Sequence, residues 1–210
     1  MRIAVVGASG ATGRQIVEQA LAEGHHVTAF VRNASRLAVR SDDLTIVQGD
    51  VMDVAAVARA VEGQEGVLCA LGAATPLRRD ATLVEGVRHI VHAMEQRDVR
   101  RLVYLSFLGV RDGRRQLSTV GKYLIAPLLL RNVVADHEAK EQIIRQSTLD
   151  WIIVRPPRLT NGPRTGRYRS GLDIRATSVI PRISRADLAD FMLRQLGADT
   201  YVRKTPAVMY

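Results

Sequence analysis

The sequence contains a single cysteine, Cys69, which lies inside the apolar run 66–71. One thiol cannot form a disulfide within the chain, and no cluster of metal-ligating residues accompanies it. We therefore expect no bound metal and a reducing, cytoplasmic compartment. No signal peptide precedes the first apolar segment, which favours the same location.

Long apolar runs are also missing. The longest spans residues 123–130 and contains Pro127. A transmembrane helix needs about 20 apolar residues, so this run is too short to cross a bilayer, and we expect a soluble protein without a membrane partner. The wider apolar segment 117–130 is compatible with a lid, a dimer surface or part of the core, which leaves a monomer and a homodimer equally open.

Lysine-rich tails and basic strands interleaved with aromatic residues, which are typical of nucleic-acid-binding proteins, are not found. The chain nevertheless carries a formal net charge of +9, and arginine supplies most of it. We interpret this charge as serving an anionic cofactor and a small anionic substrate, with no nucleic-acid partner. With 210 residues, 47% of them hydrophobic, and no linker or repeat, the chain suits one domain over residues 1–210.

What the sequence does contain is a glycine-rich segment directly after its first apolar run, residues 3–6. Gly7, Gly10 and Gly13 follow, and an amphipathic helical pattern includes Ile16. A strand, a glycine loop and a helix in this order can cradle the pyrophosphate of a dinucleotide, because free N–H groups at the helix N-terminus face the anion. A tight structural turn is the alternative. The predicted cradle comprises Gly7, Ser9, Gly10, Ala11, Thr12 and Gly13.

Apolar strands and amphipathic helices alternate along the chain. Further strands are expected at residues 26–31, 44–47, 67–71, 102–105 and 151–154. Such strands, separated by helices, indicate a parallel sheet covered on both faces. We predict an α/β, Rossmann-type doubly wound sheet of order 3-2-1-4-5-6, with a small C-terminal region, residues 155–183, on the substrate side. Ser184 and Asp187 have capping-box spacing and begin a last helix that Gly197 closes.

The end of the second predicted strand indicates which dinucleotide is bound. NAD sites commonly place an acidic residue about 20 residues after the glycines, where it binds the ribose hydroxyls. Here Arg32 occupies that place, and Arg36 follows. A guanidinium group can bind a 2′-phosphate through paired hydrogen bonds, so the sequence favours NADPH as the cofactor. Solvated surface arginines are the alternative.

Later strand ends add candidate cofactor contacts. After the third strand, Asp50 can accept a hydrogen bond from adenine and Val51 can pack on its ring, although Asp50 could instead cap a helix. After the fourth strand, the segment Leu71, Gly72, Ala73 includes small residues that let a dinucleotide pass close to the chain.

Several motifs together resemble one protein family. They are the glycine-rich segment, Leu105-Ser106, the segments 137–147 and 151–159, and the segment 183–191. With these motifs the chain resembles the atypical short-chain dehydrogenases/reductases of the NAD(P)H-binding, NmrA-like group. The likeness is greatest to the branch of biliverdin IX-beta reductases and flavin reductases, and it runs nearly end to end.

This resemblance implies an NADPH-dependent oxidoreductase that transfers hydride to a flavin, a tetrapyrrole or a similar conjugated acceptor. It implies that Ser106 is an active-site serine, that His137 matches a histidine of the reductase branch, and that Pro156 and Pro157 lie beside the nicotinamide. Arg158 stands where that branch has a substrate-side histidine. We therefore expect Arg158 to bind the substrate.

The acceptor itself is suggested by a run of arginines without a nearby acid. Arg158, Arg164, Arg167 and Arg169 lie in a stretch rich in proline and glycine. Placed over the carboxyl ends of the strands, their guanidinium groups would favour a planar, anionic acceptor. A solvated loop is the alternative.

Other roles stay open at this stage. Ser106 can orient the nicotinamide carboxamide, donate to the acceptor, or bond to backbone at a strand end. His137 is the second candidate catalytic residue, although a residue on the helix surface is the alternative. Lys140 could also assist, but on a polar helix face with Glu141 it is more often a solvated ion-pair residue. No Tyr-x-x-x-Lys pair is present, so ketone reduction with a tyrosine acid is not expected. The competing functions are an NmrA-like dinucleotide-sensing regulator without turnover, and a tailoring reductase or isomerase of a secondary metabolite.

Overall fold

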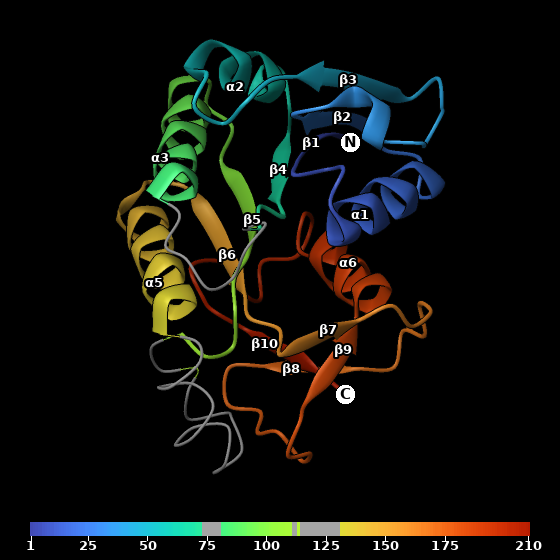
Figure 1. Ribbon diagram of the computed structural model, residues 1–210, viewed down its shortest axis with the longest axis vertical. Coiled ribbons are helices and arrows are strands. Elements are labelled where there is room, and N and C mark those ends of the chain that lie inside the picture. Colours follow the sequence, from blue (N-terminus) through green and yellow to red (C-terminus); the bar gives the residue numbers. More distant parts are fainter. Residues whose placement is uncertain (73–80, 111–112, 114–130) are drawn as a thin grey trace.

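The computed structural model describes residues 1–72, 81–110, 113 and 131–210, and the statements below concern these residues. Its centre is a six-stranded sheet in the order β3-β2-β1-β4-β5-β6 (Figure 1), which confirms the predicted order. All its pairings are parallel. The strands are β1 (Arg2–Val6), β2 (His26–Val31), β3 (Leu44–Gln48), β4 (Gly66–Cys69), β5 (Arg101–Leu105) and β6 (Asp150–Val154).

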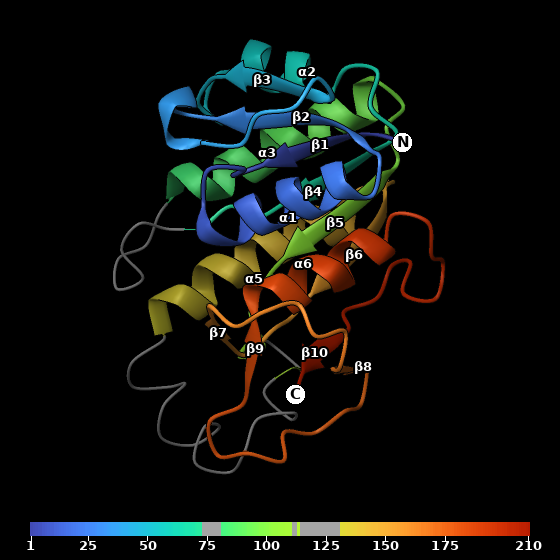
Figure 2. The ribbon, with the colours of Figure 1, turned by 90° about the vertical axis from the view of Figure 1, so that its right-hand side faces the viewer.

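Helices cover both faces of this sheet (Figures 1 and 2). On one face, α1 (Ala11–Ala22) packs against α6 (Arg185–Arg194). On the other face, α2 (Val54–Val61), α3 (Ala81–Gln96) and α5 (Arg131–Gln146) lie in a row. Each face has its own apolar core, and successive β1 residues alternate between them: Ile3 and Val5 face α1, whereas Ala4 and Val6 face α2 and α3. None of the described helices is long and apolar enough to cross a membrane.

Short strands lie beyond the carboxyl ends of β5 and β6 (Figure 1). The strand β7 (Arg158–Thr160) pairs in parallel with β9 (Arg182–Ser184), and β8 (Arg169–Gly171) pairs antiparallel with β10 (Ala207–Met209). A short 3-10 helix, η1 (Ala34–Arg36), follows β2. The region after β6 therefore stands next to the sheet edge where a Rossmann fold binds its ligands.

Two predicted boundaries differ from the structure by two residues or more, both for local steric or hydrogen-bonding reasons, and several strand ends differ by one residue. The strand β4 ends at Cys69 and not at residue 71, because its neighbour β1 ends at Val6, where the chain turns at Gly7 with a φ of +80°. The last bond between the two runs from the Ala70 N–H to the Val6 carbonyl, at 2.9 Å. The helix α6 ends at Arg194, before Gly197, because the N–H groups of Gln195 and the next residue bond three residues back and tighten the last turn. The predicted N-cap is confirmed, since Ser184 Oγ accepts a hydrogen bond from the Asp187 N–H at 2.9 Å.

The helix α6 also fastens the segment that follows β7. Asp187 is fully buried and accepts hydrogen bonds from the N–H groups of Thr165 and Gly166 and from the Tyr210 hydroxyl. Thus the segment 165–166 is held to α6 by a buried carboxylate.

Asp190, one helical turn later, accepts hydrogen bonds from Arg164, Tyr168 and Arg194. Burial acts to raise the pKa of Asp190, but the hydrogen bonds from Tyr168, Arg194 and Arg164 together outweigh it and hold the pKa below its usual value. The two aspartates therefore add a charged anchor to the packing role that the sequence predicts for this helix.

Candidate functional site

Two positions of the loop between β1 and α1 require glycine for steric reasons. Gly7 has a φ of +80°, and a Cβ there would lie 2.8 Å from the carbonyl oxygen of Ala70. A Cβ on Gly13 would lie 2.1 Å from the carbonyl oxygen of Gly7. The first turn of α1 therefore packs directly against the loop, and no larger residue fits at either position.

The N-terminus of α1 fits a pyrophosphate group. Its N-cap residue is Gly10, no side chain caps it, and its first turn contains no acidic residue. Helix N-termini leave N–H groups without intrahelical partners and carry partial positive charge. Here no side chain of the loop satisfies those groups, so they are available to an anionic ligand.

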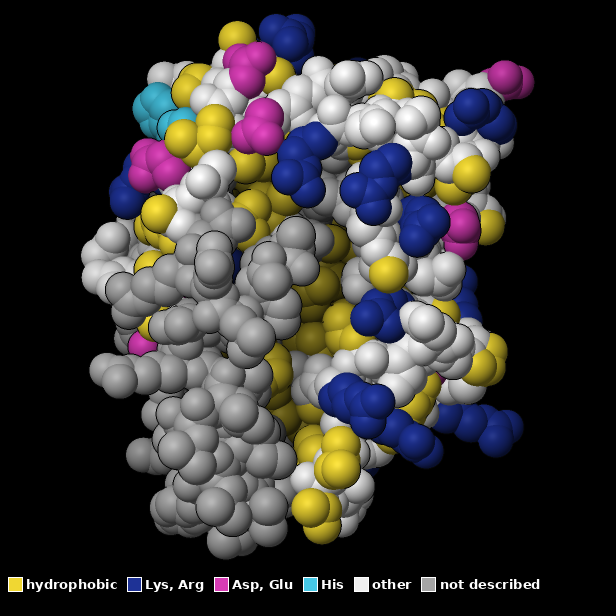
Figure 3. Space-filling model, in the orientation of Figure 1, with side chains coloured by type: hydrophobic (Ala, Val, Ile, Leu, Met, Phe, Trp, Pro, Cys, Tyr) yellow, Lys and Arg dark blue, Asp and Glu magenta, His cyan; other side chains and the backbone are white. Residues whose placement is uncertain are grey.

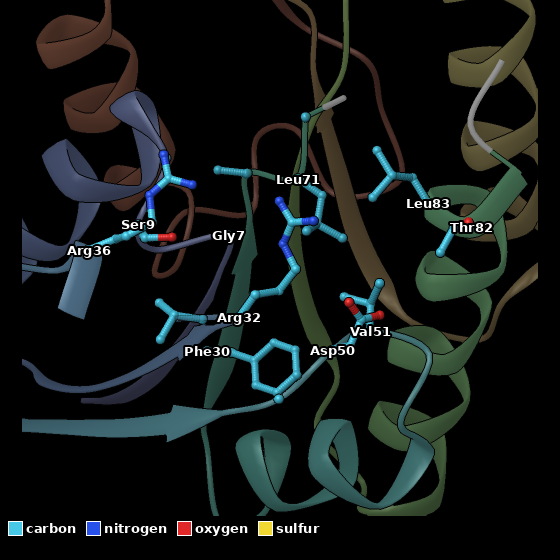
Figure 4. Close-up of a pocket in the computed structure, with 15 residues that line it drawn as sticks. Gly7, Ser9, Phe30, Arg32, Arg36, Asp50, Val51, Leu71, Thr82 and Leu83 are labelled. Carbon is cyan, nitrogen blue, oxygen red and sulfur yellow. The ribbon is translucent and has the colours of Figure 1, made fainter. Parts of the chain in front are cut away.

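A first hollow of about 430 Å³ lies over the ends of β1 to β4 (Figure 4). In Figure 4 the Arg32 side chain extends across it between Phe30 and Leu71, and Arg36 lies beside Ser9. Most of the predicted cofactor contacts line this hollow. The lining residues are Gly7, Ser9, Gly10, Phe30, Val31, Arg32, Arg36, Gly49, Asp50, Val51, Ala70, Leu71, Gly72, Thr82 and Leu83.

Arg32 and Arg36 are exposed, and neither guanidinium has a hydrogen-bond or ion-pair partner among the described residues. Their charges are therefore available to an anion. Asp50 is exposed and accepts a hydrogen bond from the Met52 N–H at 2.9 Å. The cap of α2 is Asp53, which accepts from the Ala56 N–H at 3.0 Å, so Asp50 does not have the capping role that the sequence left open.

A second hollow of about 400 Å³ continues from the first and shares four residues with it, Gly10, Ala70, Leu71 and Gly72. Figure 3 shows a groove with a hydrophobic floor and a row of Lys and Arg side chains along one rim. A long ligand that passes the shared residues would enter both hollows. The other residues lining the second hollow are Ala11, Thr12, Leu105, Ser106, Phe107, His137, Pro156, Pro157, Leu159 and Arg185.

Ser106 follows β5 directly and remains tied to the sheet through a bond from its N–H to the carbonyl of Val154 at 2.8 Å. Its hydroxyl makes no bond to the backbone of any described residue. Ser106 Oγ donates to Glu141 Oε1 at 2.7 Å and lies 3.5 Å from Nδ1 of His137. The structure therefore joins Ser106 to two residues of α5 that lie far from it in the sequence.

Glu141 is completely buried, and Arg155 is 1% exposed. Arg155 donates from Nε to Glu141 Oε1 at 3.0 Å and from Nη2 to Oε2 at 2.6 Å. The interpretation of Lys140 and Glu141 as a solvated helix face was wrong, because α5 turns both toward the sheet end and Lys140 is only 3% exposed. One signal pointed to this pair: Arg155 directly follows a buried apolar strand, where an arginine needs an acidic partner.

His137 lines the second hollow next to Phe107, with ring centroids 6.4 Å apart. Burial, with a smaller contribution from the charge of Lys140, lowers the pKa of His137 from 6.5 to about 3. The imidazole is therefore neutral at physiological pH and is not a protonated acid.

Comparison with known proteins now decides the family. The model of the NAD(P)H-binding family matches residues 7–199. The chain belongs to this family. Photosystem II assembly factor Ycf39 from Synechocystis is 26% identical to it over the full length of the chain, which spans 62% of that relative's own length.

Solved structures share the whole fold. A short-chain dehydrogenase/reductase from Veillonella parvula, in complex with NADP, superposes with a TM-score of 0.82 at 19% identity and covers 99% of this chain and 93% of its own. ChuY, an anaerobillin reductase from Escherichia coli O157:H7, gives a TM-score of 0.79 at 22% identity and covers 99% of this chain and 96% of its own. This member of the NAD(P)H-binding family therefore has a Rossmann-type fold.

None of the four arginines predicted to face the acceptor, Arg158, Arg164, Arg167 and Arg169, lines the second hollow. Arg158 is exposed and lines a separate hollow with Arg182 and Tyr210, because neighbouring residues of β7 face opposite sides and Leu159 faces the groove. Substrate binding by Arg158 stays a prediction, which this placement does not favour. The expectation for Arg164 was wrong, since Arg164 is bound to Asp190 and Glu23.

Arg169 donates to the backbone carbonyls of Arg175 and Tyr210 and does not line the second hollow. The arginine that does line it is Arg185, which was not among the residues predicted from the sequence. The only feature of the sequence that could have indicated Arg185 was its place in the first turn of the last helix. Ala73 and the apolar segment 117–130 lie outside the described residues, so those predictions stay open.

Proposed function

We propose that this NAD(P)H-binding protein is an NADPH-dependent reductase of a planar, conjugated acceptor such as a flavin or a tetrapyrrole. The observation that carries the proposal is the continuous groove. At one end it has two arginines, Arg32 and Arg36, that have no partner in the described part of the chain, and at the other end it has Ser106 among apolar side chains.

The residues of the first hollow suit the adenine half of NADPH. Arg32 and Arg36 would bind the 2′-phosphate, which is the only group that NADPH has and NADH lacks. Asp50 and Val51 would contact the adenine, and the N-terminus of α1 would hold the pyrophosphate. Bound NADPH would supply the hydride for the reaction.

The second hollow suits two flat rings in contact. Pro156, Pro157, Leu105, Phe107 and Leu159 give it apolar walls that exclude water from a ring packed against them. Holding donor and acceptor rings together in the correct orientation contributes much of the rate in a direct hydride transfer. The chain needs little further machinery for such a reaction.

Neither Ser106 nor His137 is poised to donate a proton to a ligand in the second hollow. The Ser106 proton is directed at Glu141, and His137 is neutral. A flavin or tetrapyrrole can take its proton from solvent after hydride transfer, whereas an isolated ketone needs a positioned acid. The site therefore favours conjugated acceptors over simple ketones.

Arg185 favours an acceptor that carries a carboxylate or phosphate. Its Nη1 donates to Asn161 Oδ1 at 2.6 Å, and no acidic residue within the described structure pairs with it. A neutral amide orients the guanidinium without neutralising it, so its remaining N–H groups can bind an anion.

The test is NADPH oxidation by the purified chain with FMN, riboflavin and biliverdin as acceptors, followed in single-turnover and steady-state experiments. We expect NADPH consumption matched by reduced acceptor in equal amounts. Tight NADP⁺ binding without reduction of any acceptor would overturn the proposal in favour of a dinucleotide-sensing regulator.

A further inference from the structure

The Glu141 carboxylate determines where the proton of Ser106 lies. Arg155 donates to both carboxylate oxygens, at 3.0 Å and 2.6 Å, and Arg145 Nη2 lies 3.7 Å from Oε2. Arginine has only donors, so both oxygens of Glu141 act as acceptors. The hydrogen bond of 2.7 Å between Ser106 and Glu141 therefore uses the serine's proton.

The arrangement is rigid as well as directional. Glu141 and Arg155 are both at most 1% exposed, and a buried ion pair persists only when each charge keeps its partner. A hydroxyl has one proton and two lone pairs. With the proton held by Glu141, Ser106 Oγ can present only lone pairs to the second hollow. His137 Nδ1, at 3.5 Å, is too far away to occupy them well.

We propose that Glu141 is a positioning residue that makes Ser106 a hydrogen-bond acceptor toward the second hollow, so that the ligand group meeting Ser106 is an N–H donor. This inference rests on the proposed function, in which the second hollow takes the nicotinamide end of NADPH. The carboxamide of nicotinamide carries such an N–H group. Of the roles that the sequence left open for Ser106, orientation of the carboxamide is selected and donation to the acceptor is excluded.

The first test compares binding of NADP⁺ with binding of its 3-acetylpyridine analogue, in which a methyl group replaces the carboxamide NH₂ and the carbonyl is kept. Calorimetry without any acceptor gives both affinities, and no turnover is involved. We expect the wild-type chain to prefer NADP⁺ by roughly three- to tenfold, the range for one hydrogen bond. Ser106→Ala should bind the two equally. Equal binding in the wild-type chain would overturn the proposal.

The second test is Glu141→Gln. An amide has one acceptor oxygen, and the shorter of the two bonds from Arg155, that from Nη2, favours this oxygen at the Oε2 position. The amide NH₂ then faces Ser106, and Arg155 Nε loses its acceptor. The Ser106 oxygen would then accept from the amide, and its proton would turn toward the hollow. We expect the preference for NADP⁺ over the analogue to disappear or reverse. A preference equal to that of the wild-type chain would overturn the assignment of Glu141.

The matched control is Ser147→Ala, at the end of α5, where the hydroxyl donates to the Ile144 carbonyl and lies outside both hollows. Its preference ratio should equal that of the wild-type chain. A loss of the ratio in this control as well would mean that α5 responds to any substitution, and would overturn the specific role of Glu141.

Removing one member of a buried ion pair can prevent folding, so a double replacement completes the design. Glu141→Leu with Arg155→Met removes both charges together and leaves neither one unpaired. The Ser106 hydroxyl would then rotate freely, and the ratio should fall toward one. An unchanged ratio would overturn the proposal. Failure of the proposed function would look different: the wild-type chain would not bind NADP⁺, or would bind it and reduce no acceptor.

Discussion

Replacement of Arg32 by alanine should separate the two nicotinamide cofactors. The Arg32 guanidinium extends across the first hollow, is exposed and has no partner among the described residues. A hydrogen bond to a charged group contributes about 1.5–3 kcal/mol, so losing its contact with the 2′-phosphate should weaken NADP⁺ binding roughly ten- to a hundredfold. NAD⁺ has no such phosphate, and its affinity should hardly change.

Protein stability should not account for this loss. Because no side chain depends on Arg32, the substitution should change the free energy of unfolding by less than about 0.5 kcal/mol. Calorimetric titration with NADP⁺ and NAD⁺, together with a thermal melt, measures both quantities. Arg59→Ala is the control, since Arg59 is also exposed, lies on α2 and lines neither hollow. An equal loss of affinity for both cofactors would refute the assignment of Arg32 to the 2′-phosphate.

Three further predictions test other parts of the structure. Arg185→Gln should lower the efficiency of FMN reduction by about tenfold relative to that of the neutral riboflavin. The control, Arg182→Gln, should leave this ratio unchanged. If Arg185→Gln lowered the affinity for NADP⁺ and not this ratio, Arg185 would bind the cofactor and not the acceptor. Gly13→Ala should lower both the melting temperature and the affinity for NADP⁺, because the added Cβ would lie 2.1 Å from the carbonyl oxygen of Gly7. Gly197→Ala should change neither quantity, because a Cβ on Gly197 would have no described heavy atom within 4 Å beyond its chain neighbours. Asp190 has a lowered pKa, so its stabilising contribution is present above the unfolded pKa of about 3.9 and is lost as the pH falls through the folded value. Asp190→Asn should therefore melt at a lower temperature at neutral pH and lose less further stability on acidification than the wild-type chain, and identical acid sensitivity of the two would contradict this.

The sequence by itself determined the sheet order and the glycine loop. Both depend on short-range rules. Alternation of apolar strands and amphipathic helices permits few topologies, Gly7 adopts a φ of +80° that favours glycine, and Gly13 packs against the carbonyl oxygen of Gly7 in the same loop. The position of Arg32 could be predicted for the same reason, because Arg32 directly follows the last residue of β2. These features need no knowledge of distant contacts.

The tertiary structure alone decided which polar residues act together. Ser106 and Glu141 are far apart in the sequence, and only the packing of α5 over the ends of β5 and β6 brings the carboxylate to the serine and to Arg155. The pattern of α5 is polar enough to predict a solvated face, since burial of a charge depends on a partner that lies on another element. The same reason separates Arg158 from Arg185: strand and helix orientation in the C-terminal region, and not the number of arginines there, determines which guanidinium faces the groove.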